Sequence, residues 1–316
     1  MRIVVIGGGL AAATAVEELR TLGFEGAIDL VTAEPHRPYQ RPPLSKGYLA
    51  GSEGLDAVYV HPEGWEAEHD IALHVGTPAT RISDHAVELQ DGTTLPFDRL
   101  LVATGVSPRP LPIPGADAPG VHLFRTLDDS EALHKELAEG GKRVVFIGSG
   151  WIGLELAAAA RTFGNDVTVV SLDKIPLAAA LGDEMGQMFQ RMHEEHGVAF
   201  LLERQVAAIE TGPDGHVTGV RTDRETVPAD LVVIGIGTVI DTSLAETAGI
   251  ATDHGILVDE RMQTSVPGIF AAGDVANPVH PVLGQRLRTE HWGTAIATGK
   301  VAASAMLDGD AVHDDI

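Results

Sequence analysis

The sequence opens with Arg2-Ile3-Val4-Val5-Ile6-Gly7-Gly8-Gly9-Leu10-Ala11-Ala12, and a second stretch of the same kind, Val144-Val145-Phe146-Ile147-Gly148-Ser149-Gly150-Trp151-Ile152-Gly153, lies far along the chain. Each stretch is a short β-branched run, then a tight glycine turn, then an alanine-rich segment with the composition of a helix. This order is the strand–turn–helix entry of a dinucleotide-binding βαβ unit. Because one such unit binds one dinucleotide, two units predict two bound dinucleotides, held so that one can reduce the other.

The totals restrict the class of protein. The chain has 316 residues, enough for about two domains. It has 22 Lys and Arg against 45 Asp and Glu, a net charge of −23, which disfavours nucleic-acid binding because that binding needs cations to replace phosphate counterions. No apolar run is long enough to span a membrane, and the N-terminus enters a strand without a signal-peptide pattern. We therefore expect a soluble, cytoplasmic protein.

The 316 residues include no cysteine and 14 histidines. Without cysteine these residues supply no disulfide, no thiolate metal site, no iron–sulfur ligands and no redox-active dithiol. The histidines lack the spacing of a metal site, so we expect no metal. Electrons handled by this chain must leave by a route other than a disulfide.

Alternating strand and helix patterns predict an α/β protein with parallel sheets. Two proline-rich stretches, 35–46 and 107–115, predict an extended stiff loop and an interdomain connector, and the polar tail 308–316 is expected to fray. The expected strands are 2–6, 27–32, 72–75, 86–89, 99–103, 143–147, 167–170, 231–237, 256–258 and 269–274. The expected helices are 10–22, 127–138, 153–161, 184–196 and 292–307.

The first glycine-rich unit has every part of the motif. Gly7 and Gly9 let the backbone approach a pyrophosphate, and the N–H groups that open the following helix bind that anion. Ala12 is small enough for close helix–strand packing. Glu34 lies just past the second strand, where a carboxylate accepts hydrogen bonds from a ribose.

The second unit completes the three-glycine pattern, but the acid expected after its second strand is missing, since position 171 is Ser171. A serine does not repel a 2′-phosphate as a carboxylate does, and Lys174 would attract one. Alternatively, Asp173 turns inward and takes the role of the acid. The sequence therefore predicts a nicotinamide dinucleotide and leaves NADH and NADPH open.

Gly273-Asp274 follows an apolar strand and places a carboxylate at the carboxyl edge of a sheet, where ligands of doubly wound folds bind. Most Gly-Asp turns are only turns. The weight of this one depends on the other motifs.

With these motifs in this order, the chain resembles the FAD-dependent pyridine-nucleotide oxidoreductases. Within them it looks most like the ferredoxin reductases of bacterial oxygenase systems, the group of putidaredoxin reductase, rhodocoxin reductase and the aromatic-dioxygenase reductases. The resemblance runs from Arg2 to about Gly309, and the lack of cysteine separates the chain from glutathione-reductase-like relatives. The matching residues are Pro38-Tyr39-Gln40-Arg41-Pro42-Pro43-Leu44-Ser45-Lys46, Ala103-Thr104-Gly105, Arg125-Thr126-Leu127-Asp128-Asp129, Gly148–Glu155, Ala271-Ala272-Gly273-Asp274-Val275-Ala276 and Glu290-His291-Trp292.

The resemblance implies a role for each matching position. Lys46 near flavin N5 and Glu155 near the flavin–nicotinamide stack are the implied catalytic residues, Asp274 is expected to bond the ribityl chain, and Trp292 begins a helix directed at the pyrimidine side of the flavin. The implied FAD-binding residues are Gly7, Gly9, Leu10, Ala11, Ala12, Glu34, Arg41, Lys46, Ala103, Thr104, Gly105, Arg125, Asp274, Val275 and Trp292. The implied NAD(P)-binding residues are Gly148, Gly150, Ile152, Gly153, Ser171, Gly235, Ile236 and Gly237.

The implied fold is two doubly wound Rossmann-like domains, the second inserted in the first. The FAD-binding domain is expected over 1–109 and 239–316, and the NAD(P)-binding domain over 110–238. Relatives continue into a small C-terminal domain that covers one side of the flavin. Because the chain stops at Ile316, we expect that domain to be absent.

The implied activity is transfer of a hydride from NAD(P)H to FAD, followed by transfer of single electrons to a ferredoxin-type iron–sulfur protein. Arg286 and Arg288 either help to dock such an acidic partner or are an ordinary solvated basic pair. Two alternatives stay open. One is an NAD(P)H oxidase or diaphorase that uses oxygen or small acceptors, and the other is a flavin-bearing redox sensor of the apoptosis-inducing-factor type.

Overall fold

The computed structural model describes residues 1–314 and divides into two compact units. The first unit contains residues 1–40, 58–107 and the chain from residue 240 on, and the second contains residues 41–57 and 108–239. The segment 41–57, which includes the second half of the proline-rich stretch 35–46, therefore makes most of its contacts within the second unit. The predicted domain boundaries and the cofactor expected in each domain stay predictions.

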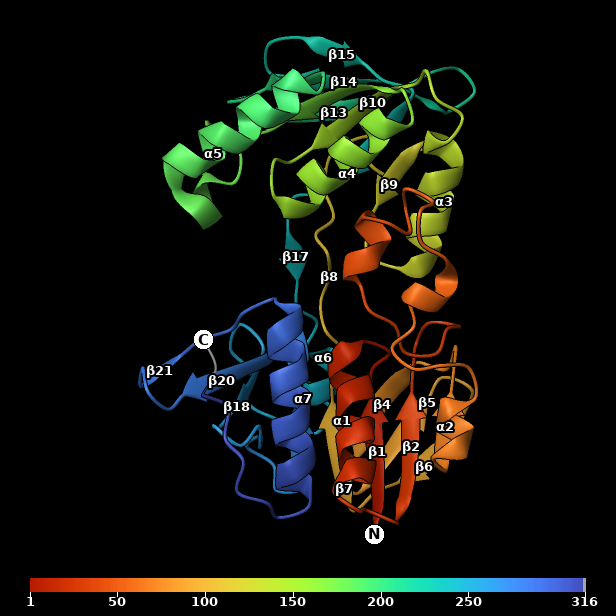
Figure 1. Cartoon of the computed structure of the whole chain (residues 1–316), viewed down its shortest axis with the longest axis vertical. Coiled ribbons are helices and arrows are strands. Elements are labelled where there is room, and N and C mark those ends of the chain that lie inside the picture. Colours follow the sequence, from red (N-terminus) through yellow and green to blue (C-terminus); the bar gives the residue numbers. More distant parts are fainter. Residues whose placement is uncertain (315–316) are drawn as a thin grey trace. The chain divides into compact units, whose positions relative to one another are not determined.

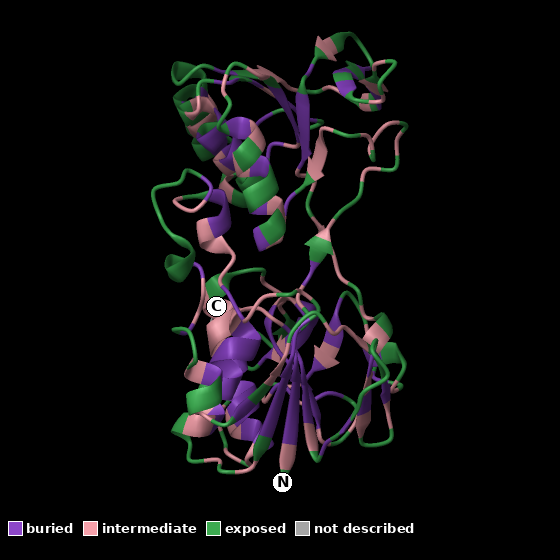
Figure 2. Ribbon diagram, turned by 90° about the vertical axis from the view of Figure 1, so that its right-hand side faces the viewer, coloured by how far each residue is buried: buried purple, intermediate pink, exposed green. Residues whose placement is uncertain are grey.

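A five-stranded parallel sheet forms the centre of the first unit, in the order β19-β7-β1-β2-β3 (Figure 1). Its strands are near-continuous apolar runs, as expected for a parallel sheet that is covered on both faces. Figure 2 shows them as a buried layer. Their bounds are Arg2–Ile6 for β1, Ala27–Val31 for β2, Ile71–His74 for β3, Arg99–Val102 for β7 and Ile269–Ala271 for β19.

Helices α1 (Leu10–Thr21) and α7 (Trp292–Met306) lie side by side in this unit (Figure 1). Gly299 of α7 faces the backbone of α1, because a Cβ added to it would lie 2.6 Å from the carbonyl oxygen of Ala11. The two helices therefore meet backbone to backbone. The remaining elements are α2 (Trp65–Glu68), α6 (Ser243–Glu246), the 3₁₀ turn η3 (Gly273–Val275), the antiparallel sheet β4 (Ala79–Ser83), β5 (Ala86–Leu89) and β6 (Thr94–Pro96), and the sheet β18 (Ile256–Val258), β20 (Ala276–His280) and β21 (Gln285–Arg286).

The second unit repeats the plan of the first, with a parallel sheet in the order β12-β11-β10-β16-β9. The strand before the glycine turn has equivalent neighbours in the two units. In the first unit β1 lies between β2 and β7, and in the second β10 lies between β11 and β16. The bounds are Val121–Leu123 for β9, Arg143–Ile147 for β10, Asp166–Val170 for β11, Val198–Leu201 for β12 and Leu231–Ile234 for β16.

The helices of the second unit are α3 (Leu127–Leu137), α4 (Trp151–Thr162) and α5 (Ala178–Glu195). An antiparallel sheet adds β13 (Val206–Thr211), β14 (Val217–Thr222) and β15 (Thr226–Pro228), and the 3₁₀ turns are η1 (Pro42–Ser45) and η2 (Leu55–Ala57). The short strands β8 (Ser107–Pro108) and β17 (Thr238–Val239) pair with each other.

The predicted α/β class with parallel sheets is confirmed, and several local expectations are wrong. The stretch 35–46 is not extended throughout, since Pro42 and Pro43, two of its four prolines, begin η1, where a proline at the start of a turn loses no hydrogen bond. The strand expected over 269–274 ends at Ala271, because Gly273 adopts a positive φ and turns the chain. Both three-stranded antiparallel sheets were missed as units.

The expected fraying of the tail is also wrong where the structure describes it. His313 is only 4% exposed, and its backbone N–H donates to the carbonyl oxygen of Glu260 at 2.7 Å. Residues 315–316 lie outside the described residues. Within residues 1–314, no helix combines the length and the apolar character needed to cross a membrane.

Candidate functional site

In the first glycine turn, Gly7 and Gly9 differ in whether the fold itself requires glycine. At Gly7, φ is +146° and a Cβ would lie 2.2 Å from the carbonyl oxygen of Ala103, so the fold itself requires glycine there. Gly9 is the N-cap residue of α1, with an ordinary φ of −100°, and a Cβ on it would meet nothing within 4 Å. The fold does not require glycine at Gly9, so its open surface fits the close approach of a ligand such as a pyrophosphate.

The second turn has the same division. A Cβ on Gly148 would lie 2.3 Å from the carbonyl oxygen of Gly235, whereas one on Gly150 would meet nothing within 4 Å. Gly150 is likewise an N-cap residue, that of α4, with φ −78°. Both turns therefore place open backbone at the first turn of a helix, where N–H groups and the helix dipole favour an anion.

The third small residue of each turn serves helix packing. A Cβ on Gly153 would lie 2.5 Å from the carbonyl oxygen of Gly148, so α4 packs closely against the backbone of the glycine turn. Ala12 is fully buried at the corresponding place of α1. Ile152, which directly precedes Gly153 in α4, is 42% exposed.

A carboxylate lies beyond the second strand of each unit. In the first unit, the buried Tyr39 donates its hydroxyl hydrogen to Oε2 of Glu34. In the second unit, Oδ2 of Asp173 accepts from Ser149 Oγ at 2.8 Å and from Ser171 Oγ at 2.9 Å. Asp173 therefore turns toward the glycine turn, which was one of the two alternatives that the sequence left open.

The predicted Asp274 lies in η3, directly after β19 at the carboxyl edge of the first sheet. Its turn is fixed to α7, since the N–H of Gly273 donates to Thr298 Oγ1 at 3.0 Å and Val275 is fully buried. Trp292 begins α7 and is 56% exposed, and the preceding His291 caps the helix through Nδ1, which accepts from the N–H of Gly293 at 3.1 Å.

Lys46 and Glu155, the two predicted catalytic residues, form an ion pair in the second unit. Lys46 Nζ lies 2.8 Å from Oε2 of Glu155, which also accepts from Ser45 Oγ at 2.6 Å. Ser45 is buried, whereas the Lys46 side chain is more than half exposed. One oxygen of Glu155 thus fixes the end of the Ser45-Lys46 segment to α4.

Arg41 and Arg125, both expected near FAD, also lie in the second unit. Arg41 donates to the carbonyl oxygen of Arg125 at 2.6 Å. The same segment is held by α3, because Ser130 Oγ donates to the carbonyl oxygen of Leu44 at 2.8 Å. These contacts fix the shape of residues 41–46 within their own unit.

The other predicted residues lie where the sheets end. Ala103 follows β7 and donates to the carbonyl oxygen of Ile6 at 2.7 Å, and Gly235 follows β16 and donates to that of Ile147 at 2.8 Å. The first unit brings together Gly7, Gly9, Leu10, Ala11, Ala12, Glu34, Ala103, Thr104, Gly105, Asp274, Val275 and Trp292. The second unit contains Arg41, Lys46, Arg125, Gly148, Gly150, Ile152, Gly153, Glu155, Ser171, Gly235, Ile236 and Gly237. Their roles in cofactor binding stay predictions.

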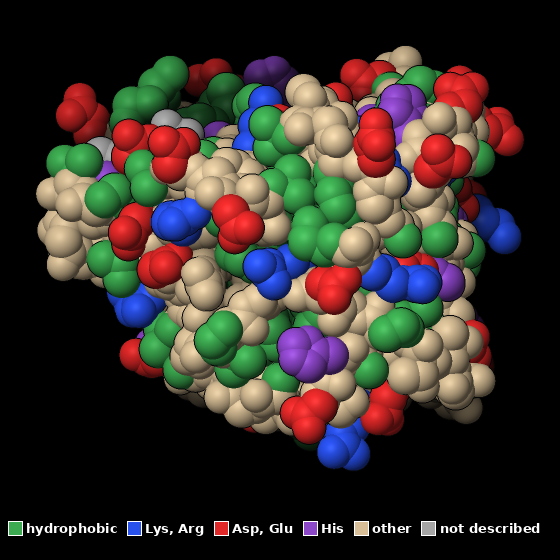
Figure 3. Space-filling view, turned by 90° about the horizontal axis from the view of Figure 1, so that it is seen from below, with side chains coloured by type: hydrophobic (Ala, Val, Ile, Leu, Met, Phe, Trp, Pro, Cys, Tyr) green, Lys and Arg blue, Asp and Glu red, His purple; other side chains and the backbone are tan. Residues whose placement is uncertain are grey.

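Arg286 and Arg288 are both engaged within the first unit. Arg286 donates to the carbonyl oxygens of Val258 and Asn277. Arg288 forms an ion pair of 2.8 Å with Glu290. Arg288 is therefore paired with an acid, whereas Arg286 keeps its positive charge, because its hydrogen-bond acceptors are neutral carbonyl oxygens. On the face shown in Figure 3, Lys and Arg side chains are scattered among Asp and Glu and form no basic patch.

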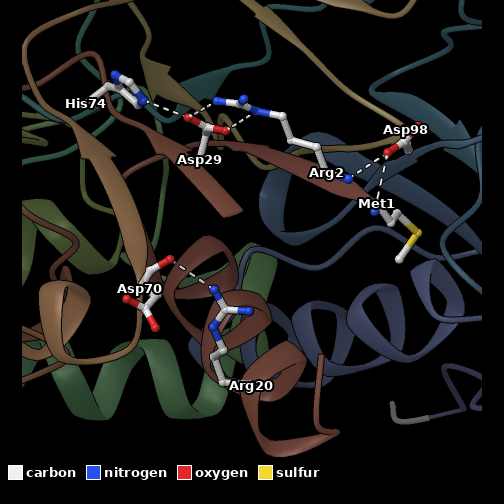
Figure 4. A network of polar contacts seen from close by, with 7 residues as sticks. All are labelled: Met1, Arg2, Arg20, Asp29, Asp70, His74 and Asp98. Atoms are coloured by element: carbon white, nitrogen blue, oxygen red, sulfur yellow. Dashed lines mark hydrogen bonds and ion pairs between the residues drawn. The ribbon is translucent and has the colours of Figure 1, made fainter. Parts of the chain in front are cut away.

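A buried carboxylate in the first unit has a structural explanation. Asp29, 2% exposed, accepts from Arg2 Nε at 2.7 Å and Nη2 at 3.0 Å, and lies 3.0 Å from His74 Nε2 (Figure 4). The hydrogen bond that Arg2 donates to the Asp29 carboxylate raises the pKa of the Arg2 guanidinium. Because these bonds satisfy both carboxylate oxygens, Asp29 holds neighbouring strands together and is no candidate for catalysis. Among residues 1–314, no three His, Asp or Glu side chains are grouped to hold a metal ion.

The fold, the two glycine turns and the acids beyond them define a protein with two dinucleotide-binding βαβ units. Comparison with protein families gives the class: the model of the pyridine nucleotide-disulphide oxidoreductase family matches residues 1–299. The chain belongs to this family. Since its 316 residues contain no cysteine, they carry none of the thiols that the family name refers to.

Individual relatives narrow the comparison. Rhodocoxin reductase of Rhodococcus erythropolis is 42% identical over 99% of this chain and 73% of the relative. The anthranilate 1,2-dioxygenase system ferredoxin–NAD(+) reductase component of Burkholderia cepacia is 38% identical over 99% of this chain and 77% of the relative. Among solved structures, the covalent putidaredoxin reductase–putidaredoxin complex matches with a TM-score of 0.94 and 35% identity, over 98% of this chain and 75% of that one. The chain thus spans about three quarters of the length of these relatives.

Proposed function

We propose that this chain is a flavoprotein reductase that takes a hydride from a reduced nicotinamide dinucleotide and passes single electrons to a ferredoxin-type iron–sulfur protein. One observation carries the proposal. Relatives that align with nearly the whole chain, at 35–42% identity, are named as reductases of ferredoxins or of oxygenase systems. The two glycine turns agree with it, because each offers backbone that the fold leaves open to a ligand.

The residues of the first unit fit the adenosine and pyrophosphate part of FAD. Gly9 and the first turn of α1 would hold the pyrophosphate, Glu34 the ribose, and Asp274 the ribityl chain. When bound, FAD accepts a two-electron hydride and releases electrons one at a time, which is chemistry that no side chain of this protein supplies. The protein's contribution is binding, orientation and electrostatics.

Lys46 and Glu155 supply the electrostatics in this proposal. An ammonium at Lys46 stabilises negative charge that develops on a neighbouring group, and Glu155 holds that ammonium in one place. Ser45 fixes the carboxylate in turn through its 2.6 Å hydrogen bond. Lys46 therefore acts as a positioned charge, and no proton transfer by either residue is required.

We propose NADH as the preferred donor. Several relatives are named as NAD(+) reductases, among them the reductase components from Burkholderia cepacia and Photorhabdus laumondii, which are 38% and 35% identical. One relative from Sphingomonas, 39% identical, is named as a ferredoxin–NAD(P)(+) reductase. Direct comparison of the two coenzymes decides the matter.

The deciding experiment begins with the absorbance spectrum of the purified protein and an anaerobic titration with NADH and NADPH. We expect a flavin spectrum that bleaches within milliseconds to seconds of mixing with coenzyme in a stopped-flow instrument. Re-oxidation should then be faster with a [2Fe–2S] ferredoxin than with oxygen. A colourless protein that refuses added FAD would overturn the proposal. Rapid re-oxidation by oxygen alone would identify an oxidase, and a long-lived reduced complex would identify a redox sensor.

A further inference from the structure

The two units correspond residue by residue at the ends of their sheets. Gly7 donates its N–H to the carbonyl oxygen of Val31 at 2.8 Å, and Gly148 donates to that of Val170 at the same distance. Each of these acceptors is the last residue of the second strand in its unit. The glycine turn and the end of the second strand are therefore joined in the same way in both units.

The correspondence continues one residue further. Thr32 donates its N–H to His74 at 2.8 Å, and Ser171 donates its N–H to Leu201 at 3.1 Å; both acceptors are carbonyl oxygens of the third strand. Thr32 thus corresponds to Ser171. Counting on two residues from each, Glu34 of the first unit corresponds to Asp173 of the second.

The Asp173 carboxylate is held against the glycine turn. Its Oδ2 accepts from Ser149 Oγ at 2.8 Å and Ser171 Oγ at 2.9 Å, and these two hydroxyl oxygens are 3.0 Å apart. Ser149 is the middle residue of the turn, and both serines are at least 95% buried. Two buried hydroxyl groups therefore fix the position of the Asp173 carboxylate, although Asp173 itself is exposed to solvent.

We propose that Asp173 is the residue that binds the adenosine ribose of the nicotinamide coenzyme and discriminates against a 2′-phosphate. Within residues 1–314, the side-chain hydrogen bonds that the Asp173 carboxylate accepts use Oδ2, which leaves Oδ1 to accept from a ribose hydroxyl. A phosphate at the 2′ position would face the same carboxylate and be repelled. Ser171, where the motif led us to look for the acid, instead orients Asp173.

The adjacent Lys174 favours the opposite preference, since an ammonium attracts a 2′-phosphate. The structure distinguishes the two side chains by their support. Asp173 is fixed by two hydroxyl groups of the turn, and Lys174 is an exposed side chain at the next position. A fixed charge discriminates better than a mobile one because less rotamer entropy is lost when the ligand binds.

The inference rests on the proposed use of a nicotinamide coenzyme, and its test uses the FAD-loaded protein. Isothermal calorimetry with NAD⁺ and NADP⁺ gives the affinity ratio for wild type and for Asp173→Asn, which keeps the shape and removes the charge. We expect wild type to favour NAD⁺, and the variant to lose about tenfold in NAD⁺ affinity while its NADP⁺ affinity rises. Flavin reduction by NADH and NADPH is the second readout.

The matched control is Asp166→Asn, which removes the same charge at the other end of β11, where the side chain is 86% exposed. This variant should keep the wild-type ratio. An unchanged ratio in Asp173→Asn, or a wild-type preference for NADP⁺ that Lys174→Gln abolishes, would overturn the assignment and leave the reductase proposal standing. Wild-type protein that binds neither dinucleotide would overturn both.

Discussion

Lys46 Nζ and Glu155 Oε2 lie 2.8 Å apart although 109 residues separate them in sequence. The ion pair joins the proline-rich segment to the helix that follows the second glycine turn. This contact therefore connects the residue expected beside the flavin ring with the element that is expected to bind the coenzyme. Both residues belong to one unit, so the connection does not depend on how the two units are placed.

Glu155→Gln tests the role of this pair. The amide keeps a hydrogen-bond acceptor for Ser45 but removes the charge that restrains Lys46. Because small displacements of a catalytic charge are costly, we expect flavin reduction by NADH to slow about tenfold with unchanged FAD content. Stopped-flow absorbance measures the rate. The control is Glu131→Gln in the same unit, since the Glu131 carboxylate also accepts a hydrogen bond, from Tyr48. If Glu155→Gln reduces its flavin no more slowly than this control, the role is refuted.

Glycine substitutions should separate folding from binding. In Gly7→Ala the new methyl group meets a backbone oxygen at a positive φ, so we expect a loss of roughly 2 kcal/mol or more in the free energy of unfolding. In Gly9→Ala the methyl group meets open space, so stability should change by less than about 1 kcal/mol while FAD affinity falls at least tenfold. Denaturant unfolding and flavin fluorescence measure the two effects.

The second turn supplies the matched control for this experiment. Gly150→Ala has the same open surroundings as Gly9→Ala, so it should raise the KM for NADH and leave FAD content unchanged. Loss of FAD from Gly150→Ala, or full retention of FAD by Gly9→Ala, would show that the open glycines do not mark separate dinucleotide sites.

Tyr39→Phe tests whether a buried hydroxyl group orients Glu34. The ring would still fill its fully buried place, but Glu34 would lose a hydrogen-bond donor. Hydrogen bonds to charged groups are each worth about 1.5–3 kcal/mol, so we expect FAD affinity to fall about tenfold. Ultrafiltration followed by flavin absorbance measures the retained FAD. Tyr59→Phe, a partly exposed neighbour, should retain FAD as wild type does, and equal retention by both variants would contradict this role of Tyr39.

His193 predicts a pH dependence of stability. Burial lowers the pKa of this imidazole below its usual value of 6.5, with a smaller effect from the charge of His196. Below pH 6.5 the unfolded chain therefore binds more protons than the folded chain, and stability falls as pH falls, by at most about 1.4 kcal/mol per pH unit. Thermal unfolding between pH 5 and pH 8 should show a steeper acid loss for wild type than for His193→Gln. His254→Gln, which alters a 92% exposed side chain, should follow wild type.

The two parallel sheets were largely predictable because their buried strands are unbroken apolar runs in the sequence. The runs at 2–6 and 143–147 give the bounds of β1 and β10 as the structure has them. The antiparallel sheet β13–β15 was missed because its strands are partly exposed and their buried and exposed positions do not alternate regularly. Its turn, with Asp214-Gly215, was a signal that could have revealed the hairpin.

The site divides along similar lines. Glycines at fixed spacings can be recognised in the sequence alone. Asp173 could be considered as the ribose-binding acid because it lies two residues from Ser171, where the motif places that acid. Ser45, Tyr39 and Thr298 were not identified as supporting residues, because each acts through a hydrogen bond to a partner chosen by the fold. Ser45 meets an acid 110 residues away, and no local pattern encodes such a pair.

The contact between Gly299 and Ala11 links helix packing to the predicted flavin site. At Gly299 no side chain separates α7 from the backbone of α1, so any larger residue at position 299 would push α7 away from α1. Thr298 would move with it, and with Thr298 the turn that presents Asp274. A screen of colonies or lysates for loss of yellow colour would therefore detect damage to this helix junction as readily as damage to residues that touch the pigment.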